Sequence, residues 1–488
     1  MKNLRRKTLA AASVVALGVG LAATGGLAPA AAAGPETTFL VLAPQGGKTD
    51  KAAARVAAAN GTVVASYNQI GVLVVRSTNP NFATAVAGAG VDAVASTAGL
   101  GTALDEGETV EVSAADATGD PTKEPMYAQQ WDMDMIHVPQ AHAVNAGSSN
   151  VVVGVLDSGI SSSHPDLATQ IAKDKSVSCI GGATNTAEAA WNPTTSDHGT
   201  HVAGTIAAAV NGVGVTGIAP GAKVAAVKVV NDDGYIFPEA AVCGFMWAAD
   251  HGMQLTNNSY YIDPWEMNCR NDARQRPVWQ AVQRAIRYSQ SKGVLNVASA
   301  GNSNYDLAHK ITDTGSPNNG TPENRENLTN ACLDLPAEVP GVVTVGAVGP
   351  TGEKSYYSSY GQGVIDVTAP GGDSRFRTQG ARSTSTDAVL STTFNTATRT
   401  NGWGYKQGTS MSGPHATGVA ALALSAHPGM TPGQLSSFLE RTAVAQSCPK
   451  GVYNPVPLLG DTYNATCSGG NRNGFYGFGM VDAYNVVK

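Results

Sequence analysis

The stretch that decides the fold is Val151-Val152-Val153-Gly154-Val155-Leu156-Asp157, an apolar, β-branched run that ends in a carboxylate. Such a run predicts a strand buried on both faces of a parallel sheet. Similar runs follow at residues 224–230, 294–298 and 342–348, and helical patterns alternate with them at residues 200–210, 238–251, 277–291 and 415–426. The alternation predicts an α/β fold with a mostly parallel sheet between helices. Its ligand crevice should lie outside the carboxyl ends of the strands.

Upstream of this sheet, residues 34–104 contain no cysteine and form a separate unit. Apolar runs at residues 39–42, 62–66, 71–75 and 91–94 and helical stretches at residues 51–59 and 82–87 give the order β-α-β-β-α-β. We therefore expect a small ferredoxin-like α+β domain. Residues 105–124 follow as an acidic linker without apolar periodicity, which predicts an exposed segment open to cleavage. The alternative is an ordinary domain that stays attached to residues 125–488.

Residues 1–33 resemble a secretory signal. Lys2, Arg5, Arg6 and Lys7 precede an Ala/Val/Leu-rich stretch, and small residues at positions 30–33 suit signal peptidase. An uncleaved anchor is the alternative, since no charge occurs between Lys7 and Glu36. Glycines weaken the apolar run, so we expect a secreted, extracellular protein without a stable membrane anchor.

The composition excludes one class of partner. Lys and Arg number 31 against 37 Asp and Glu, and the formal charge is -6. No basic stripe occurs that could neutralise a phosphate backbone, so nucleic acid is not an expected partner.

The chain has six cysteines, an even number in a protein expected to be exported. Three disulfides are therefore predicted. The sequence favours only the local pair of Cys448 with Cys467, because Gly, Pro and Asn between them suit a closed surface loop. Free buried thiols are the alternative.

Three positions carry residues suited to chemistry, although each alone has a simpler reading. Asp157 follows a buried strand, where many aspartates only cap a turn. His198, in Asp197-His198-Gly199-Thr200-His201, suits a general base but equally a structural role or a metal pair with His201. Ser410, in Gly408-Thr409-Ser410-Met411, precedes an apolar helix and resembles an ordinary N-cap. A helix N-terminus also supplies oriented N–H donors for a developing oxyanion.

Together these positions are far more specific. The chain order Asp157, His198, Ser410 and the flanking words Asp157-Ser158-Gly159, His198-Gly199-Thr200-His201 and Gly408-Thr409-Ser410-Met411 resemble the three signatures of the subtilisin-like serine proteases, the subtilases. The resemblance runs from about residue 127 to residue 488. It implies a three-layer α/β/α fold and excludes an α/β-hydrolase, whose elbow is G-x-S-x-G and whose order is Ser, acid, His.

The resemblance implies a role for each catalytic residue. Ser410 would attack the scissile carbonyl, His198 would accept its proton and return it to the leaving amine, and Asp157 would hold the imidazole tautomer. Asn302, in Ala298-Ser299-Ala300-Gly301-Asn302, matches the oxyanion-hole asparagine of the family. The backbone N–H of Ser410 would be the second donor. No catalytic cofactor is implied.

Peptide substrates should add as a strand beside two segments of the cleft. The segments that match are Asn257-Asn258-Ser259-Tyr260-Tyr261 and Ser299-Ala300-Gly301. Tyr260 and Tyr261 replace the small glycines usual in the family, which predicts narrowed subsites unless the rings only pack under a loop.

A second departure is the stretch of residues 303–335, rich in Asn, Gly and Pro. A bond from Cys332 to Cys269 would tether it. The resemblance places Asp334 near the floor of the pocket for the side chain that precedes the cut, where the kexin-like branch uses an Asp to bind Arg or Lys. The alternative is a solvated loop aspartate.

Calcium is the one cofactor that the resemblance raises, as a structural ion. Asp166 and Asn211 match side-chain ligands of the strong calcium site of the family, while the expected glutamine ligand would be Gln129, Gln130 or neither.

The small first domain gains a role from the same resemblance, because subtilase propeptides have its element order and occupy the cleft until they are cut away. We expect a monomeric zymogen with its own propeptide as intramolecular inhibitor, cut within residues 119–127, that then acts on protein or peptide substrates. The rival hypotheses are a catalytically dead binding protein of the same fold and an esterase or peptide ligase that uses the same triad.

Overall fold

The computed structural model describes residues 34–46, 48–97, 103, 110–112, 124–317, 323, 325–375 and 387–488. The expected signal segment and most of the acidic linker lie outside the described residues. Among the described helices, none is long and apolar enough to cross a membrane.

A parallel seven-stranded sheet forms the centre of the main domain, in the order β16-β15-β11-β9-β6-β8-β7. Its strands are β6 (Val152–Asp157), β7 (Val177–Ser178), β8 (Lys223–Lys228), β9 (Leu255–Asn258), β11 (Leu295–Ser299), β15 (Val343–Val348) and β16 (Val367–Pro370). Every residue of β6 is buried, as its unbroken apolar run predicted. The predicted parallel α/β sheet is confirmed.

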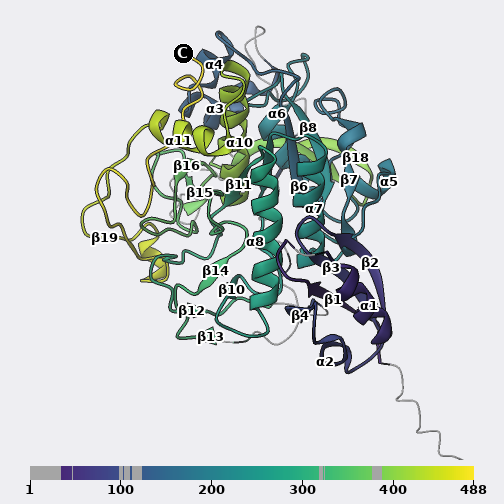
Figure 1. Cartoon of the computed structure of the whole chain (residues 1–488). Helices are drawn as coiled ribbons and strands as arrows, with labels where there is room; N and C mark the ends of the chain where they lie inside the picture. Colours follow the sequence, from purple (N-terminus) through teal and green to yellow (C-terminus); the bar gives the residue numbers. More distant parts are fainter. Residues whose placement is uncertain are drawn as a thin grey trace, which may run out of the picture.

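Helices cover both faces of this sheet and complete a three-layer α/β/α arrangement (Figure 1). Val153 and Val155 of β6 share one apolar cluster with α6 (His198–Ala207) and α10 (Thr409–Ala426). Val152 and Leu156, which point the other way, share a second cluster with α7 (Pro238–Asp250) and α8 (Arg276–Ser291). Alternate side chains of one strand therefore anchor the two helical layers.

Smaller elements surround these layers. They are α3 (Trp131–Met135), α4 (Val138–His142), α5 (Glu188–Trp191), α11 (Pro432–Thr442), β10 (Met267–Cys269), β12 (Thr312–Asp313), β13 (Arg325–Glu326), β14 (Cys332–Asp334), β17 (Val389–Asn395), β18 (Thr400–Lys406), β19 (Val452–Tyr453) and β20 (Ala465–Thr466). The three disulfides predicted are present as Cys179–Cys243, Cys269–Cys332 and Cys448–Cys467.

Helix α10 begins at Thr409, six residues before the start predicted at residue 415. Proline has no N–H to bond the carbonyl four residues earlier, so Pro414 disfavours a helix that starts before it. That carbonyl belongs to Ser410, and it accepts a hydrogen bond from Ser259 Oγ at 2.9 Å instead. A side chain from β9's end thus replaces the missing helical bond, and the nucleophile candidate lies in the first turn rather than before it.

The N-terminal domain has the predicted element order. Its elements are β1 (Thr37–Leu42), α1 (Asp50–Ala58), β2 (Gly61–Tyr67), β3 (Val72–Ser77), α2 (Phe82–Val86) and β4 (Ala93–Ser96). The strands form one antiparallel sheet in the order β2-β3-β1-β4. Phe39 and Phe82 belong to the domain's own apolar core on one side of this sheet.

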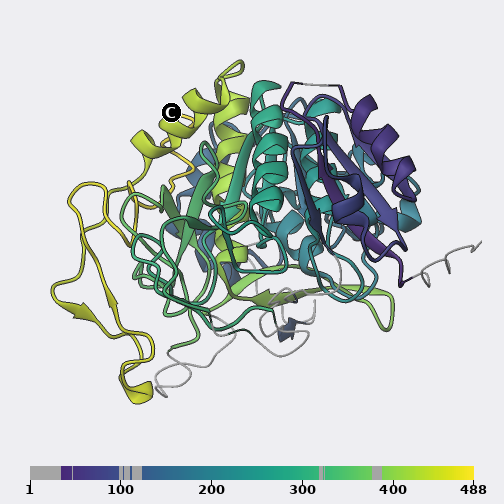
Figure 2. The same cartoon turned by 60° about the horizontal axis from the view of Figure 1, so that its bottom comes forward.

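The other face of that sheet packs on the main domain. Leu40, Leu42, Val72 and Val74 belong to the same apolar cluster as α7 and α8, and Figure 2 shows the purple N-terminal strands beside the teal helices. Arg284 of α8 also donates from Nη1 to the Ala43 carbonyl at 2.8 Å. The N-terminal domain is therefore docked through an apolar face with polar contacts at its edge.

One described part of the linker differs from its prediction. Residues 110–112 form a short strand, β5 (Val110–Val112), which pairs antiparallel with β18. The outer edge of β18 in the β17–β18 hairpin provides the backbone partners for β5. The sequence of the linker alone does not indicate this pairing.

Candidate active site

Asp157 and His198 form a buried pair at the carboxyl edge of the sheet. Asp157 ends β6, His198 is the first residue of α6, and both are 0% exposed. His198 Nδ1 lies 2.9 Å from Asp157 Oδ1 and 3.0 Å from Oδ2. A Cβ on Gly199 would come within 3.1 Å of Asp157 Oδ1, so a glycine must follow this histidine. The carboxylate therefore fixes the ring orientation and keeps the proton on Nδ1.

Ser410 lies in the first turn of α10, which packs directly against α6. Its hydroxyl donates to the Ser259 carbonyl at 3.3 Å, and its side chain lines a cavity. The eighteen residues of α10 direct the positive end of the helix dipole at this hydroxyl.

Asn302 is fixed through its amide oxygen, whereas its amide nitrogen donates no hydrogen bond within the described residues. Its Oδ1 accepts from the backbone N of Thr409 at 2.9 Å and from the Thr409 hydroxyl at 2.8 Å. A Cβ on Gly408 would lie 3.3 Å from Asn302 Nδ2 and 3.6 Å from Ser410 N. The space left by this glycine is thus flanked by the amide nitrogen of Asn302 and the backbone nitrogen of Ser410.

A cavity of about 210 Å³ opens beside these groups. It is lined by Ala103, Ser259, Tyr260, Tyr261, Glu266, Ser299, Gly301, Asn302, Ser303, Gly315, Asp334, Thr409 and Ser410. All of the predicted substrate-binding residues line it except Ala300. Ala300 is 0% exposed and donates its N–H to the Val345 carbonyl at 3.0 Å, so it packs into the sheet instead.

The family model described as the subtilase family matches residues 148–479. The chain belongs to the subtilase family. Subtilisin NAT from Bacillus subtilis subsp. natto is 32% identical over 321 residues, which are 65% of this chain and 67% of that protein. Fervidolysin from Fervidobacterium pennivorans is 31% identical over 333 residues, 64% of this chain and 40% of that protein. The chain therefore spans less than half of fervidolysin.

Solved structures agree with this assignment. A protease from Pseudoalteromonas arctica is 28% identical with a TM-score of 0.55, over 75% of this chain and 98% of that chain. The epidermin leader peptide processing serine protease from Staphylococcus aureus is 20% identical with a TM-score of 0.67, over 93% of this chain and 98% of that chain. The second likeness is one of fold. Membership of the family makes this chain a subtilisin-like serine protease, a class without a catalytic cofactor.

Tyr260 of this subtilase both packs in the interior and borders the cavity, so the two predicted alternatives for its ring are not exclusive. Its side chain is 4% exposed and belongs to the apolar cluster under α7, and its hydroxyl donates to Asn258 Oδ1 at 3.0 Å. The same residue also forms part of the cavity wall, together with the half-buried Tyr261.

Five residues of the cavity wall were not predicted: Ala103, Glu266, Ser303, Gly315 and Thr409. Thr409 lies in the motif Gly408-Thr409-Ser410-Met411, so its position next to Ser410 could have predicted it. Glu266, Ser303 and Gly315 lie in segments where the subtilase pattern offered no matching residue, so only the fold could bring them to the cleft.

The predicted calcium ligands lie together but do not fit a calcium ion. Asp166 Oδ2 accepts from the Trp403 indole Nε1 at 2.8 Å and from Val215 N at 3.2 Å. Asn211 presents its amide nitrogen to Asp166 Oδ1 at 3.4 Å. Calcium requires free oxygen ligands, whereas N–H donors already occupy this carboxylate. Asp166 Oδ2 is therefore already used by the indole N–H of Trp403.

The raised pKa of the Asp166 carboxyl is consistent with a neutral partner, the Trp403 indole, rather than a metal ion. Burial, which outweighs the hydrogen bond from Trp403, raises the pKa of Asp166 to about 6. Gln130, one of the alternative ligands, exchanges hydrogen bonds with the backbone of Thr216 at 2.9 and 3.0 Å. Gln129 accepts from the Tyr405 hydroxyl at 3.1 Å. The calcium prediction is therefore corrected for this donor set.

Proposed function

We propose that this subtilase is a secreted serine endopeptidase that is made as a self-processing zymogen. The observation that carries the proposal is the buried Asp157–His198 pair, with Nδ1 to Oδ1 at 2.9 Å, on a helix packed against the one that presents Ser410. Calcium is left out of the proposal because Asp166 is already engaged.

In the proposed reaction Ser410 Oγ attacks the scissile carbonyl while His198 accepts its proton. Asp157 keeps the imidazole in the required tautomer and stabilises the imidazolium that forms. The tetrahedral oxyanion then accepts hydrogen bonds from Asn302 Nδ2 and Ser410 N. His198 returns its proton to the leaving amine, and water hydrolyses the acyl-enzyme by the same steps in reverse order.

Thr409 positions the oxyanion hole. Because its N–H and hydroxyl both donate to Asn302 Oδ1, the amide cannot rotate to present oxygen to the substrate. The donor is therefore in place before charge develops, which is the condition for large electrostatic stabilisation.

The N-terminal domain is the proposed intramolecular inhibitor. Its sheet is docked on α7 and α8, and Ala103, beyond its last strand, lines the cavity that Ser410 also lines. The sequence predicted a cut within residues 119–127. The place of Ala103 supports a cut nearer to that residue, and mass spectrometry of the mature N-terminus distinguishes the two positions.

Labelling with a fluorophosphonate tests the proposal. We expect Ser410 to be modified in wild-type protein, and Ser410→Ala to remain unlabelled and to keep its N-terminal domain attached. A folded wild-type protein that resists labelling would support the rival of a catalytically dead binding protein. Comparing ester with amide turnover separates an endopeptidase from an esterase or ligase on the same triad.

A further inference from the structure

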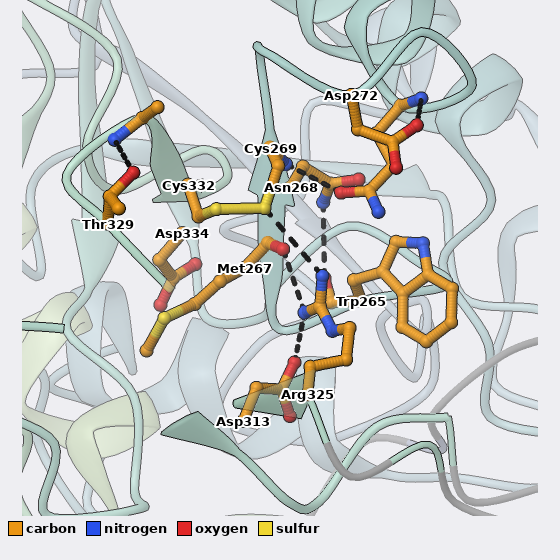
Figure 3. The surroundings of a disulfide bond; sticks show 12 residues. Trp265, Met267, Asn268, Cys269, Asp272, Asp313, Arg325, Thr329, Cys332 and Asp334 are labelled. Atoms are coloured by element: carbon orange, nitrogen blue, oxygen red, sulfur yellow. Dashed lines mark hydrogen bonds and ion pairs between the residues drawn. A yellow bond between two sulfur atoms is a disulfide. The ribbon is translucent and has the colours of Figure 1, made fainter. Parts of the chain in front are cut away.

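Two buried carboxylates lie at one side of the substrate cavity. Glu266 is 6% exposed and Asp334 is 2% exposed, and both line the cavity together with Ser410. Antiparallel pairing of β10 with β14 places Asp334 opposite Met267, the neighbour of Glu266 in the chain. The Cys269–Cys332 disulfide joins the same two strands (Figure 3). The two acids are therefore held by one tethered strand pair.

Their oxygens converge on the empty position beside Gly301. Glu266 Oε1 and Asp334 Oδ2 each lie 3.5 Å from the point that a Cβ on Gly301 would occupy, so they are at most twice that distance apart. Asp334 Oδ1 is buried and makes no hydrogen bond within the described part of the chain. Glu266 accepts from the Ser303 hydroxyl at 3.1 Å. Room and unused acceptors therefore coincide next to Asn302.

The nearest guanidinium is committed elsewhere (Figure 3). Arg325 forms an ion pair with Asp313 and donates from Nη2 to the Met267 carbonyl at 2.9 Å. Its guanidinium also stacks 4.5 Å from the centre of the Trp265 ring. These contacts leave Arg325 paired with Asp313 rather than with either cavity acid.

The nearby ammonium group is committed in the same way. Lys310 Nζ lies 2.6 Å from Glu338 Oε1 and 2.7 Å from the Leu307 carbonyl, and it is almost fully buried. Among the described residues, each cation of this neighbourhood thus has a carboxylate of its own. Glu266 and Asp334 have none, although buried carboxylates are normally paired with a cation.

We propose that the missing cation is the P1 side chain of the substrate, the residue that precedes the scissile bond, and that this residue is arginine or lysine. The inference rests on the proposed endopeptidase function and assigns Glu266 as a second specificity residue beside Asp334. A guanidinium suits the site best because its five N–H donors can reach two carboxylates at once.

Selectivity for the cation should then depend on pH. Burial, with Asp313 nearby, raises the pKa of Glu266 to about 8. Burial and then Glu266 raise the pKa of Asp334 well above its usual range. The charged or titratable groups that face this pair are Asp313, Arg325, Tyr305, Glu338 and Lys310. As pH rises towards 8, Glu266 ionises, and the cavity gains charge that attracts a cation but not an aromatic ring.

The test compares two tetrapeptide amides that differ only in Arg or Phe at P1, by kcat/KM from pH 6 to pH 9. For wild type we expect the Arg peptide to be preferred at pH 8, and the Arg-to-Phe ratio to rise from pH 6 to about pH 8. Glu266→Gln and Asp334→Asn should each lower that ratio at least about tenfold. Glu326→Gln, an exposed acid in the same insertion, should leave the ratio unchanged.

Fluorophosphonate labelling separates the two levels of failure. Labelled enzyme that prefers the Phe peptide at pH 8, or whose Arg-to-Phe ratio is the same in Glu266→Gln, overturns the cation pocket alone. Wild-type protein that is neither labelled nor active on either peptide overturns the proposed function and this inference with it. The wild-type ratio decides the question even where a variant does not fold.

Discussion

Replacing Glu239 by glutamine should remove most of the pH dependence of docking between the N-terminal domain and the main domain. Glu239 is the second residue of α7 and is 4% exposed. Thr97 of the N-terminal domain hydrogen-bonds to its carboxyl, and Glu239 Oε2 is buried without a partner among the described residues. Burial raises the pKa of Glu239 from 4.5 to about 7.

The raised pKa of Glu239 determines how docking changes with pH. The docked state favours the protonated carboxyl, so docking is strongest below pH 4.5, weakens as pH rises from 4.5 to about 7, and is constant above that. A pKa raised from 4.5 to about 7 corresponds to at most about 3 kcal/mol, or roughly 300-fold in affinity. This is an upper bound because α7 itself shields part of the carboxyl before docking.

The assay uses the N-terminal domain and the mature enzyme that the proposed processing would give, and it measures the inhibition constant of the domain from pH 5 to pH 8. Wild type should bind its domain more weakly at pH 8, whereas Glu239→Gln should show a nearly flat profile. Asp250→Asn, at the exposed end of the same helix, is the matched control. A flat wild-type profile, or an equal slope in Glu239→Gln, would refute the reasoning.

Three other outcomes can be checked separately. Asn302→Ala should lower kcat about 10²–10³-fold with little change in KM, a loss established for subtilisin itself rather than worked out from this chain; unchanged kcat would exclude the oxyanion role. Ser259→Ala leaves the Ser410 carbonyl without its donor and should cost about 1–3 kcal/mol of unfolding free energy in urea denaturation, and an unchanged midpoint would contradict this. A chelator should leave the melting temperature unchanged because Trp403 occupies Asp166, and a fall in that temperature would restore the calcium site.

Local pattern was sufficient for the strands and for the position of Asp157 at the end of one of them. The β-branched run that ends at Asp157 is buried on both faces of a sheet, and no other environment suits it as well. The motifs around His198 and Ser410 are short because each of these residues lies in the first turn of a helix, close to a glycine where a larger side chain would clash. Such constraints act between neighbours in the chain, so the sequence displays them.

What escaped prediction depends on partners far away in the chain. Trp403 reaches Asp166 across 237 positions, and no local signal announces an indole in place of an ion. Ser259 lies 151 positions from the carbonyl it satisfies, so no local signal indicates that α10 continues back past Pro414. Glu266 acquires its meaning only when β10 pairs with β14 and brings it to the cavity with Asp334.

The apolar face through which the N-terminal sheet docks has a consequence for activation. If the domain is released as proposed, Leu40, Leu42, Val72 and Val74 would lose the helices that cover them. The released domain would then expose an apolar face, which favours association and proteolysis. A domain that had inhibited the enzyme before release, as proposed, would then become its substrate. Activation of this protease would then be irreversible, because the released domain would be degraded and could not bind again.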